Sequence, residues 1–227
     1  MPEVQPPPSR LPSLPYVLPF ALFLVLLGLM PLLPLGPRVD QAARLVLVGG
    51  ALLLVSRPVL DLRVPHVAGS VLLGVLVFAI WIAPDVLVPG WRELPLFSNR
   101  LTAATGGGFP VEARGDPVAV GLRFLRAAAL VPIIEELFWR AWLPRWIVNP
   151  SFQKVPLGTY TPAAFWITAV LFGMEHGAWW DVGLVAGILY NWWMRRTRSL
   201  GDCIAAHAVT NGCLSAYVVA AGKWEYW

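Results

Sequence analysis

Three short groups of polar residues interrupt apolar stretches of this sequence, and their side chains could together activate a water molecule. The groups are Glu135, Glu136 and Arg140; Phe172 and His176; and His207 and Asn211. A carboxylate can take a proton from water, while imidazole and amide groups can position that water and stabilise an oxyanion. Ionisable residues inside a membrane cost about 2.5–3.5 kcal/mol each on insertion scales, so chains keep them mainly where they pair or act.

The first group places two adjacent carboxylates and an arginine on one helical segment. Glu136 and Arg140 are four residues apart, so they share a helix face and can form an ion pair. Glu135 is rotated by about 100° from Glu136, so its side chain can point elsewhere, into a cavity. The alternative interpretation is a purely structural ion pair that locks two helices together.

The other two groups each place a histidine one helical turn from a second residue. His176 follows Phe172 by four residues, and His207 precedes Asn211 by four. A histidine near a helix end is often an interfacial residue, and Glu175 beside His176 could mean that this end faces water; we assign Glu175 no role. The second pair could equally be a structural pair that bonds to a neighbouring helix.

The depth of these residues in their segments indicates whether they can meet. Glu135 lies ten residues before Arg145, and His207 lies nine residues after Arg198. At a rise of 1.5 Å per residue these offsets are about 15 Å and about 13.5 Å from one membrane face. His176 lies about 21 Å into its own segment, a little more than one turn deeper, which helix tilt can absorb. The sequence therefore predicts that the three side chains meet near the middle of a membrane.

The composition requires such a membrane setting. Hydrophobic residues make up 57% of the 227 residues and charged residues only 13%, about half of the roughly 25% in an ordinary soluble domain. A soluble enzyme, a disordered chain and a coiled coil are therefore excluded. The net charge of +4 does not indicate nucleic-acid binding, because no Lys/Arg run with interleaved aromatic residues is present. We expect an all-α, polytopic transmembrane bundle with about seven (six to eight) membrane helices around an active-site cavity.

The apolar runs predict the order of these helices. Pro132 should kink the fourth one, and the basic run Arg195-Arg196-Thr197-Arg198 favours a cytoplasmic N-terminus. The expected helices cover residues 14–35, 41–55, 66–88, 117–148, 161–176, 182–194 and 203–221. The expected organisation is a Pro-rich tail at 1–13, N-terminal transmembrane helices at 14–88, a polar loop at 89–116, a catalytic transmembrane core at 117–221 and a C-terminal tail at 222–227.

The order Glu-Glu-x-x-x-Arg, Phe-x-x-x-His and His-x-x-x-Asn resembles the CAAX protease and bacteriocin-processing family. These are glutamic intramembrane proteases that include the Ras-converting CAAX endopeptidase. The resemblance covers about residues 117–221. The stretch from His207 to Asn211, together with the ending Lys-Trp-Glu-Tyr-Trp227, resembles a bacterial branch found beside exosortase sorting systems. The resemblance implies an integral protein of a bacterial cell membrane.

The resemblance also implies a role for each matching residue. Glu135 would act as general base on a water molecule that His176 positions and polarises. His207 and Asn211 would donate hydrogen bonds to the developing oxyanion. The residues that would hold these groups in place are Glu136, Arg140 and Phe172. The implied enzyme hydrolyses a peptide bond near the C-terminus of a membrane-anchored or lipidated protein, with no metal, cofactor or nucleic acid.

Two other classes of protein remain open. A zinc protease could use Glu135, His176 and His207 as three metal ligands, although the sequence has no His-Glu-x-x-His helix. A non-catalytic immunity factor, scaffold or transporter could use the same charges to lock helices or line a path, although no internal repeat is visible. The substrate stays open as well, because a prenylated C-terminal Cys motif, a C-terminal sorting helix and a leader peptide all fit.

Overall fold

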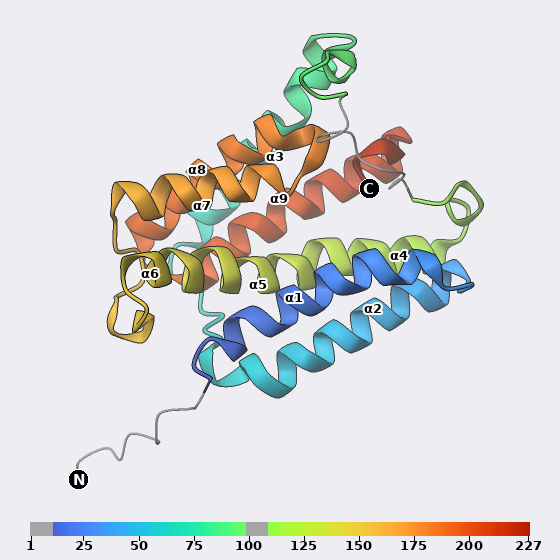
Figure 1. Cartoon of the computed structure of the whole chain (residues 1–227). Coiled ribbons are helices and arrows are strands. Elements are labelled where there is room, and N and C mark those ends of the chain that lie inside the picture. Colours follow the sequence, from blue (N-terminus) through green and yellow to red (C-terminus); the bar gives the residue numbers. More distant parts are fainter. Residues whose placement is uncertain (1–10, 99–108) are drawn as a thin grey trace.

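The computed structural model describes residues 11–98 and 109–227, and every regular element within these two ranges is helical (Figure 1). Most of the expected Pro-rich tail and the Gly106-Gly107-Gly108 run of the expected polar loop lie outside the described residues. The α-helices of the described part are α1 (Leu14–Leu29), α2 (Pro37–Ala51), α3 (Val67–Leu87), α4 (Pro117–Leu125), α5 (Val131–Glu136), α6 (Leu143–Val148), α7 (Pro162–Met174), α8 (Trp180–Thr197) and α9 (Leu200–Ala221).

Several helical segments are long and apolar enough to cross a membrane. The five that qualify are Leu14–Leu32, Pro37–Val59, Val67–Leu87, Pro117–Val148 and Leu200–Ala221. Helix α7 is a shorter apolar helix, and α8 carries more polar residues. Many large apolar side chains stand on the outside, among them Leu54 and Leu72, as a lipid solvent requires. The expectation of an all-helical membrane bundle with about seven helices is confirmed.

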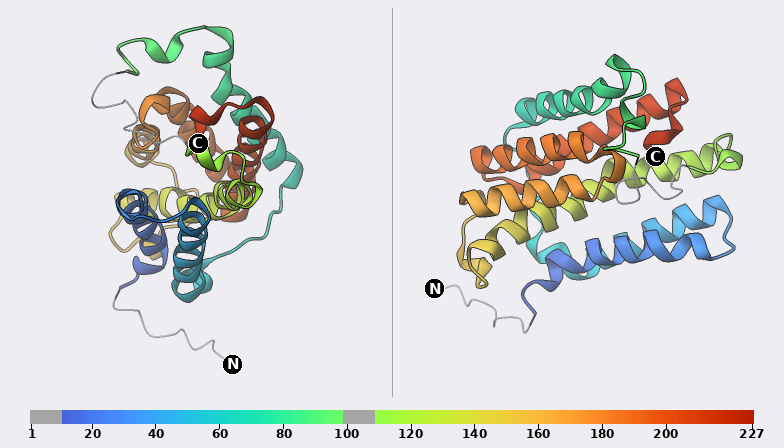
Figure 2. Two further views of the ribbon diagram at one scale, coloured as in Figure 1. Left: turned by 90° about the vertical axis from the view of Figure 1, so that its right-hand side faces the viewer. Right: turned by 45° about the horizontal axis from the view of Figure 1, so that its top comes forward.

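The long rod formed by α4, α5 and α6 runs through the bundle between the α1–α2 pair and the other helices (Figures 1 and 2). Helix α9 packs against α3, α5 and α8, and α7 packs along α8. The α3–α9 contact is close at Gly74, where an added Cβ would overlap the backbone of Ala206. The rod and α9 therefore bring the first and third polar groups together.

The rod is continuous, but its turns are not uniform. The turns at Arg126–Leu130 and Leu137–Trp142 are π-helical, so the hydrogen bonds span five residues instead of four. The first widened turn comes directly before Pro132, the residue predicted to kink the helix, and the helix continues through it. Asp116 caps the start of the rod by accepting hydrogen bonds from the backbone N–H groups of Val118 and Ala119. Glu135 and Glu136 thus lie on a short regular stretch between two widened turns.

Candidate active site

A cavity of about 200 Å³ lies between the rod, α7 and α9. The four predicted catalytic residues, Glu135, His176, His207 and Asn211, line it, and so does Phe172. Glu135 lies on α5, His176 follows α7, and His207 and Asn211 lie one turn apart on α9. The structure therefore brings these four side chains to the wall of one cavity.

Glu135 on α5 has its carboxylate buried, with 6% of the residue exposed. Its Oε2 atom has no hydrogen-bond partner among the described residues. The Nε2 atom of His207 lies 3.9 Å from this oxygen, too far for a direct hydrogen bond. A carboxylate oxygen that borders a cavity without a protein partner is placed to accept a proton from a small molecule inside it.

Glu136, the next residue on α5, is fully buried. Its Oε1 accepts a hydrogen bond from His207 Nδ1 at 2.8 Å, and its Oε2 lies 3.4 Å from Arg140 Nε. The ion pair with Arg140 was expected from the four-residue spacing, whereas the contact with His207 was not. Because Nδ1 is the donor, the Nε2 atom of His207 carries a hydrogen only when the ring is protonated. A donor role for His207 Nε2 toward an oxyanion therefore requires a second proton on the ring.

His176 lies two residues after Met174, the last residue of α7, where the carbonyls of the final turn lack helical partners. Its Nδ1 donates to the carbonyl oxygen of Phe172 at 2.7 Å, which leaves a lone pair on Nε2. Its ring packs between Trp81 and Phe172, with centroid distances of 5.0 and 4.8 Å. The Phe172 ring also lies 4.3 Å from the Arg140 guanidinium. The structure therefore places Phe172 between the arginine and the histidine.

Asn211 has a backbone partner that explains its position. Its Nδ2 donates to the carbonyl of Ala127 at 3.0 Å, in the first widened turn of the rod. The Val131 N–H bonds to the Arg126 carbonyl in this turn, so the next bond would run from residue 132 to Ala127. Pro132 has no N–H to give, and the side chain of Asn211 supplies the missing donor. One of its two amide hydrogens is used in this way, and the second remains for the cavity.

Tyr190 and Thr210 hold His207 from a second direction, and sequence reasoning missed both. The Tyr190 ring stacks on the His207 ring at 5.1 Å. Its hydroxyl donates to Thr210 Oγ1 at 2.7 Å, and Thr210 Oγ1 donates to the Gly74 carbonyl at 2.9 Å. Thr210 could have been noticed because it lies three residues after His207, on the same helix face. Tyr190 gives no such signal.

Glu175 is the other residue that sequence reasoning left out. One oxygen of Glu175, one of Glu135 and a ring nitrogen of His176 all lie within 4.8 Å of one another. Such a set of two carboxylates and an imidazole could hold a divalent cation. The metal ligands considered from the sequence included His207, but the group of atoms that lie within 4.8 Å of one another does not include its ring nitrogens. The geometry thus favours Glu175 as the third ligand, and its position beside His176 was the available signal.

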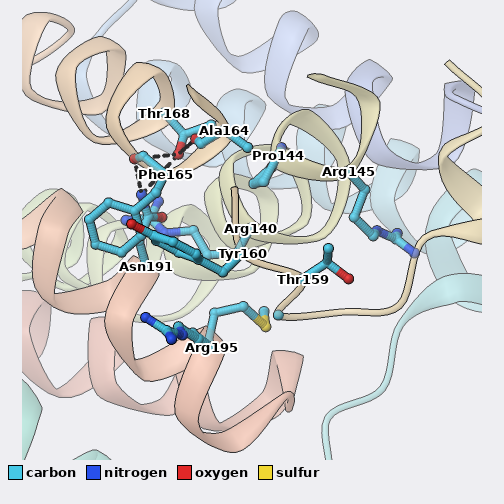
Figure 3. A pocket seen from close by; sticks show the side chains of 12 residues that line it. Arg140, Pro144, Arg145, Thr159, Tyr160, Ala164, Phe165, Thr168, Asn191 and Arg195 are labelled. Carbon is cyan, nitrogen blue, oxygen red and sulfur yellow. Dashed lines mark hydrogen bonds between the residues drawn. The ribbon is translucent and has the colours of Figure 1, made fainter. Parts of the chain in front are cut away.

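A second, smaller cavity lies next to Arg140 (Figure 3). No directed hydrogen bond within the described residues reaches the Arg140 guanidinium. The small cavity has a volume of about 30 Å³, enough for one water molecule, which could bond to it. On its wall Asn191 Nδ2 donates to Thr168 Oγ1 at 2.8 Å and to the Phe165 carbonyl at 2.9 Å. These bonds fix α8 against α7 beside the arginine.

Comparison with known proteins identifies the segment that carries the site. Residues 117–213 match the family model described as type II CAAX prenyl endopeptidase Rce1-like. No curated protein and no solved structure matches the chain. The matched segment contains all three motifs, so the resemblance to the CAAX protease and bacteriocin-processing family is confirmed. The match and the membrane-length helices support an integral membrane peptidase of the CAAX-endopeptidase type that acts on a protein substrate.

Proposed function

We propose that this chain, whose residues 117–213 match an endopeptidase family, is a glutamic-type intramembrane protease in which Glu135 activates water. The observation that carries the proposal is the Oε2 atom of Glu135, which is buried, unpartnered and at the wall of a cavity shared with His176, His207 and Asn211. A carboxylate oxygen without a protein hydrogen-bond partner has a lone pair free to accept a proton from a bound water molecule. This environment suits proton abstraction from water.

The proposed reaction assigns a role to each of the four predicted catalytic residues that line the cavity. Water binds between Glu135 and the Nε2 lone pair of His176, and Glu135 accepts a proton as the water oxygen attacks the peptide carbonyl carbon. The free amide hydrogen of Asn211 and the protonated Nε2 of His207 donate to the tetrahedral oxyanion. The carbon–nitrogen bond then breaks, and Glu135 returns its proton to the leaving nitrogen. The products are a carboxylic acid and an amine, and transfer of the remaining water proton from the acid to the amine gives a carboxylate and an ammonium group.

The proposed substrate is a membrane-anchored or lipidated protein that is cleaved near its C-terminus. The family name refers to prenylated CAAX proteins, and a prenyl chain or a C-terminal helix would reach the buried cavity through the lipid. The proposed location is a bacterial cell membrane, supported by the resemblance of the C-terminal run to the exosortase-associated branch.

Comparison of membrane proteomes tests this function. Cells that contain the wild-type protein should show new protein C-termini that are missing from cells with Glu135→Gln, an isosteric change that removes the base. The two proteins should be equally abundant in the membrane. The absence of new C-termini in both strains would favour a scaffold. Normal cleavage by Glu135→Gln would contradict a general-base role for Glu135.

A metal-dependent peptidase is the second candidate, because Glu135, Glu175 and His176 are close enough to share a cation. Zinc held there would lower the pKa of a bound water to about 7. Elemental analysis of the purified protein, together with activity in the presence of a strong chelator, separates the two mechanisms. Full activity of metal-free protein would support the glutamic mechanism. Loss of activity on chelation, with recovery on addition of Zn²⁺, would support the metal.

A further inference from the structure

A third cavity, distinct from the catalytic cavity and from the small one beside Arg140, lies along the rod. It is located where α1 ends and α2 begins, away from the proposed catalytic residues. Its volume is about 380 Å³. Three arginines line it, and its other polar lining consists of one amide and two carboxylates. The polar lining residues are Arg44, Arg123, Arg126, Gln41, Asp40 and Glu112. The proposed reaction uses none of them.

Two of the three arginines have no compensating charge. Arg44 pairs with Asp40 at 2.9 Å, which leaves Arg123 and Arg126 without an ion pair among the described residues. Arg126 is only 3% exposed, and its Nε and Nη1 atoms have no hydrogen-bond partner there. Glu112 lies on the exposed rim and pairs with neither. A buried, unpaired guanidinium at a cavity wall is a strong hydrogen-bond donor and binding site for an anion, especially a planar carboxylate.

The catalytic cavity and this third cavity have two lining residues in common, Arg123 and Trp227. The Arg123 guanidinium lies 5.6 Å from the centroid of the Trp227 ring. These two side chains therefore form a boundary that both cavities share. This adjacency favours an anion that belongs to the substrate over a lipid phosphate.

We propose that Arg123 and Arg126 bind the C-terminal carboxylate of the substrate. The proposal rests on the endopeptidase function proposed above and adds the rule that selects the cleaved bond. Arg126 precedes Glu135 by nine residues, about 13.5 Å along a helix axis. An extended peptide advances about 3.3 Å per residue, so about four residues fit between the cleaved bond and the carboxylate. The distance between the two arginines and Glu135 thus sets how far from the C-terminus the peptide bond is cleaved.

A matched pair of peptides tests the carboxylate site. The probe is a prenylated, internally quenched peptide ending in Cys-Val-Ile-Met, prepared once with a free C-terminal carboxylate and once as the C-terminal amide. Wild-type protein should cleave the acid with a kcat/KM about ten- to hundredfold higher than the amide, as expected for loss of a charged hydrogen bond. Arg126→Gln should lower cleavage of the acid to the level of the amide and leave the amide rate unchanged. Arg196→Gln, the same change at an exposed position outside both cavities, should keep the preference.

The outcomes separate this inference from the proposed function. Equal cleavage of acid and amide by wild-type protein would overturn the carboxylate site and leave the endopeptidase standing. If neither peptide is cleaved, binding to Glu135→Gln protein by fluorescence anisotropy gives the answer, since tighter binding of the acid supports the site and equal binding overturns it. A phospholipid phosphate would give a third pattern. Arg126→Gln would then slow both peptides equally, and only when phosphatidylglycerol is added to the detergent, which would also overturn the proposal.

Discussion

Replacing Asn211 with alanine should produce two separable losses, because the Asn211 amide has two hydrogens and two places to give them. One hydrogen bonds to the Ala127 carbonyl at 3.0 Å, and the other faces the catalytic cavity. Stranding the Ala127 carbonyl should lower the free energy of unfolding by about 1–3 kcal/mol. Losing an oxyanion donor should raise the barrier by about 2.7–4 kcal/mol, a fall in kcat of about a hundredfold or more.

A second substitution separates the two losses. Pro132 lacks the N–H that would otherwise reach Ala127 in the widened turn, so Pro132→Ala returns a backbone donor to that carbonyl. In the Asn211→Ala background, Pro132→Ala should therefore recover much of the lost stability and none of the lost turnover. Pro132→Ala alone is the control, and it should leave kcat close to that of the wild type.

Melting curves in detergent and single-turnover kinetics on a fluorogenic peptide measure the two quantities on the same samples. Recovery of turnover together with stability in the double variant would show that Asn211 acts only as a structural bond. An unchanged melting temperature in Asn211→Ala would refute the argument about the Ala127 carbonyl. A selective fall in kcat at constant KM supports a donor that acts mainly in the transition state.

Glu136→Ala and Arg140→Ala should each lower the melting temperature as well as the activity. Removing one partner leaves the other as an unpaired buried charge, which costs about 3–5 kcal/mol. If both variants melted at the same temperature as the wild-type protein, the ion pair would be refuted. Glu175→Gln should retain most of the cleavage activity under the glutamic mechanism, since the proposed proton transfers do not pass through it. A loss as large as that of Glu135→Gln, measured with the same peptide, would instead favour a metal held by Glu135, Glu175 and His176.

The helical rise was sufficient to predict that Glu135 and His207 meet. Both lie on uninterrupted helices whose ends are marked by basic residues, so counting residues gives their depth. The depth of a residue does not give its rotation about the helix axis relative to a neighbouring helix. For this reason the hydrogen bond from His207 to Glu136 could not be predicted, although the ion pair within one helix from Glu136 to Arg140 could.

Other contacts of the candidate site could be predicted from the sequence only in part or not at all. Tyr190 packs on His207 from a different helix, and no spacing rule connects the two residues in the sequence. Pro132 predicted a disturbance of the rod, and the structure shows a widened turn before it instead of a break in the helix. The partner of the freed carbonyl, Asn211, comes from α9 and is therefore invisible to local patterns. Contacts between helices depend on packing, which a single sequence does not display.

Glu135 and Glu136 have the same type of side chain, but the helix places these two side chains in different environments. A rotation of about 100° per residue directs them to different neighbours. Glu136 faces His207 and Arg140, so its charge is matched on both oxygens. Glu135 lines the cavity, and its Oε2 has a longer contact of 3.9 Å to His207 Nε2. The glutamate that lines the cavity is therefore the one placed to react with a bound water, while Glu136, with shorter contacts to His207 and Arg140, is suited to hold His207 in place.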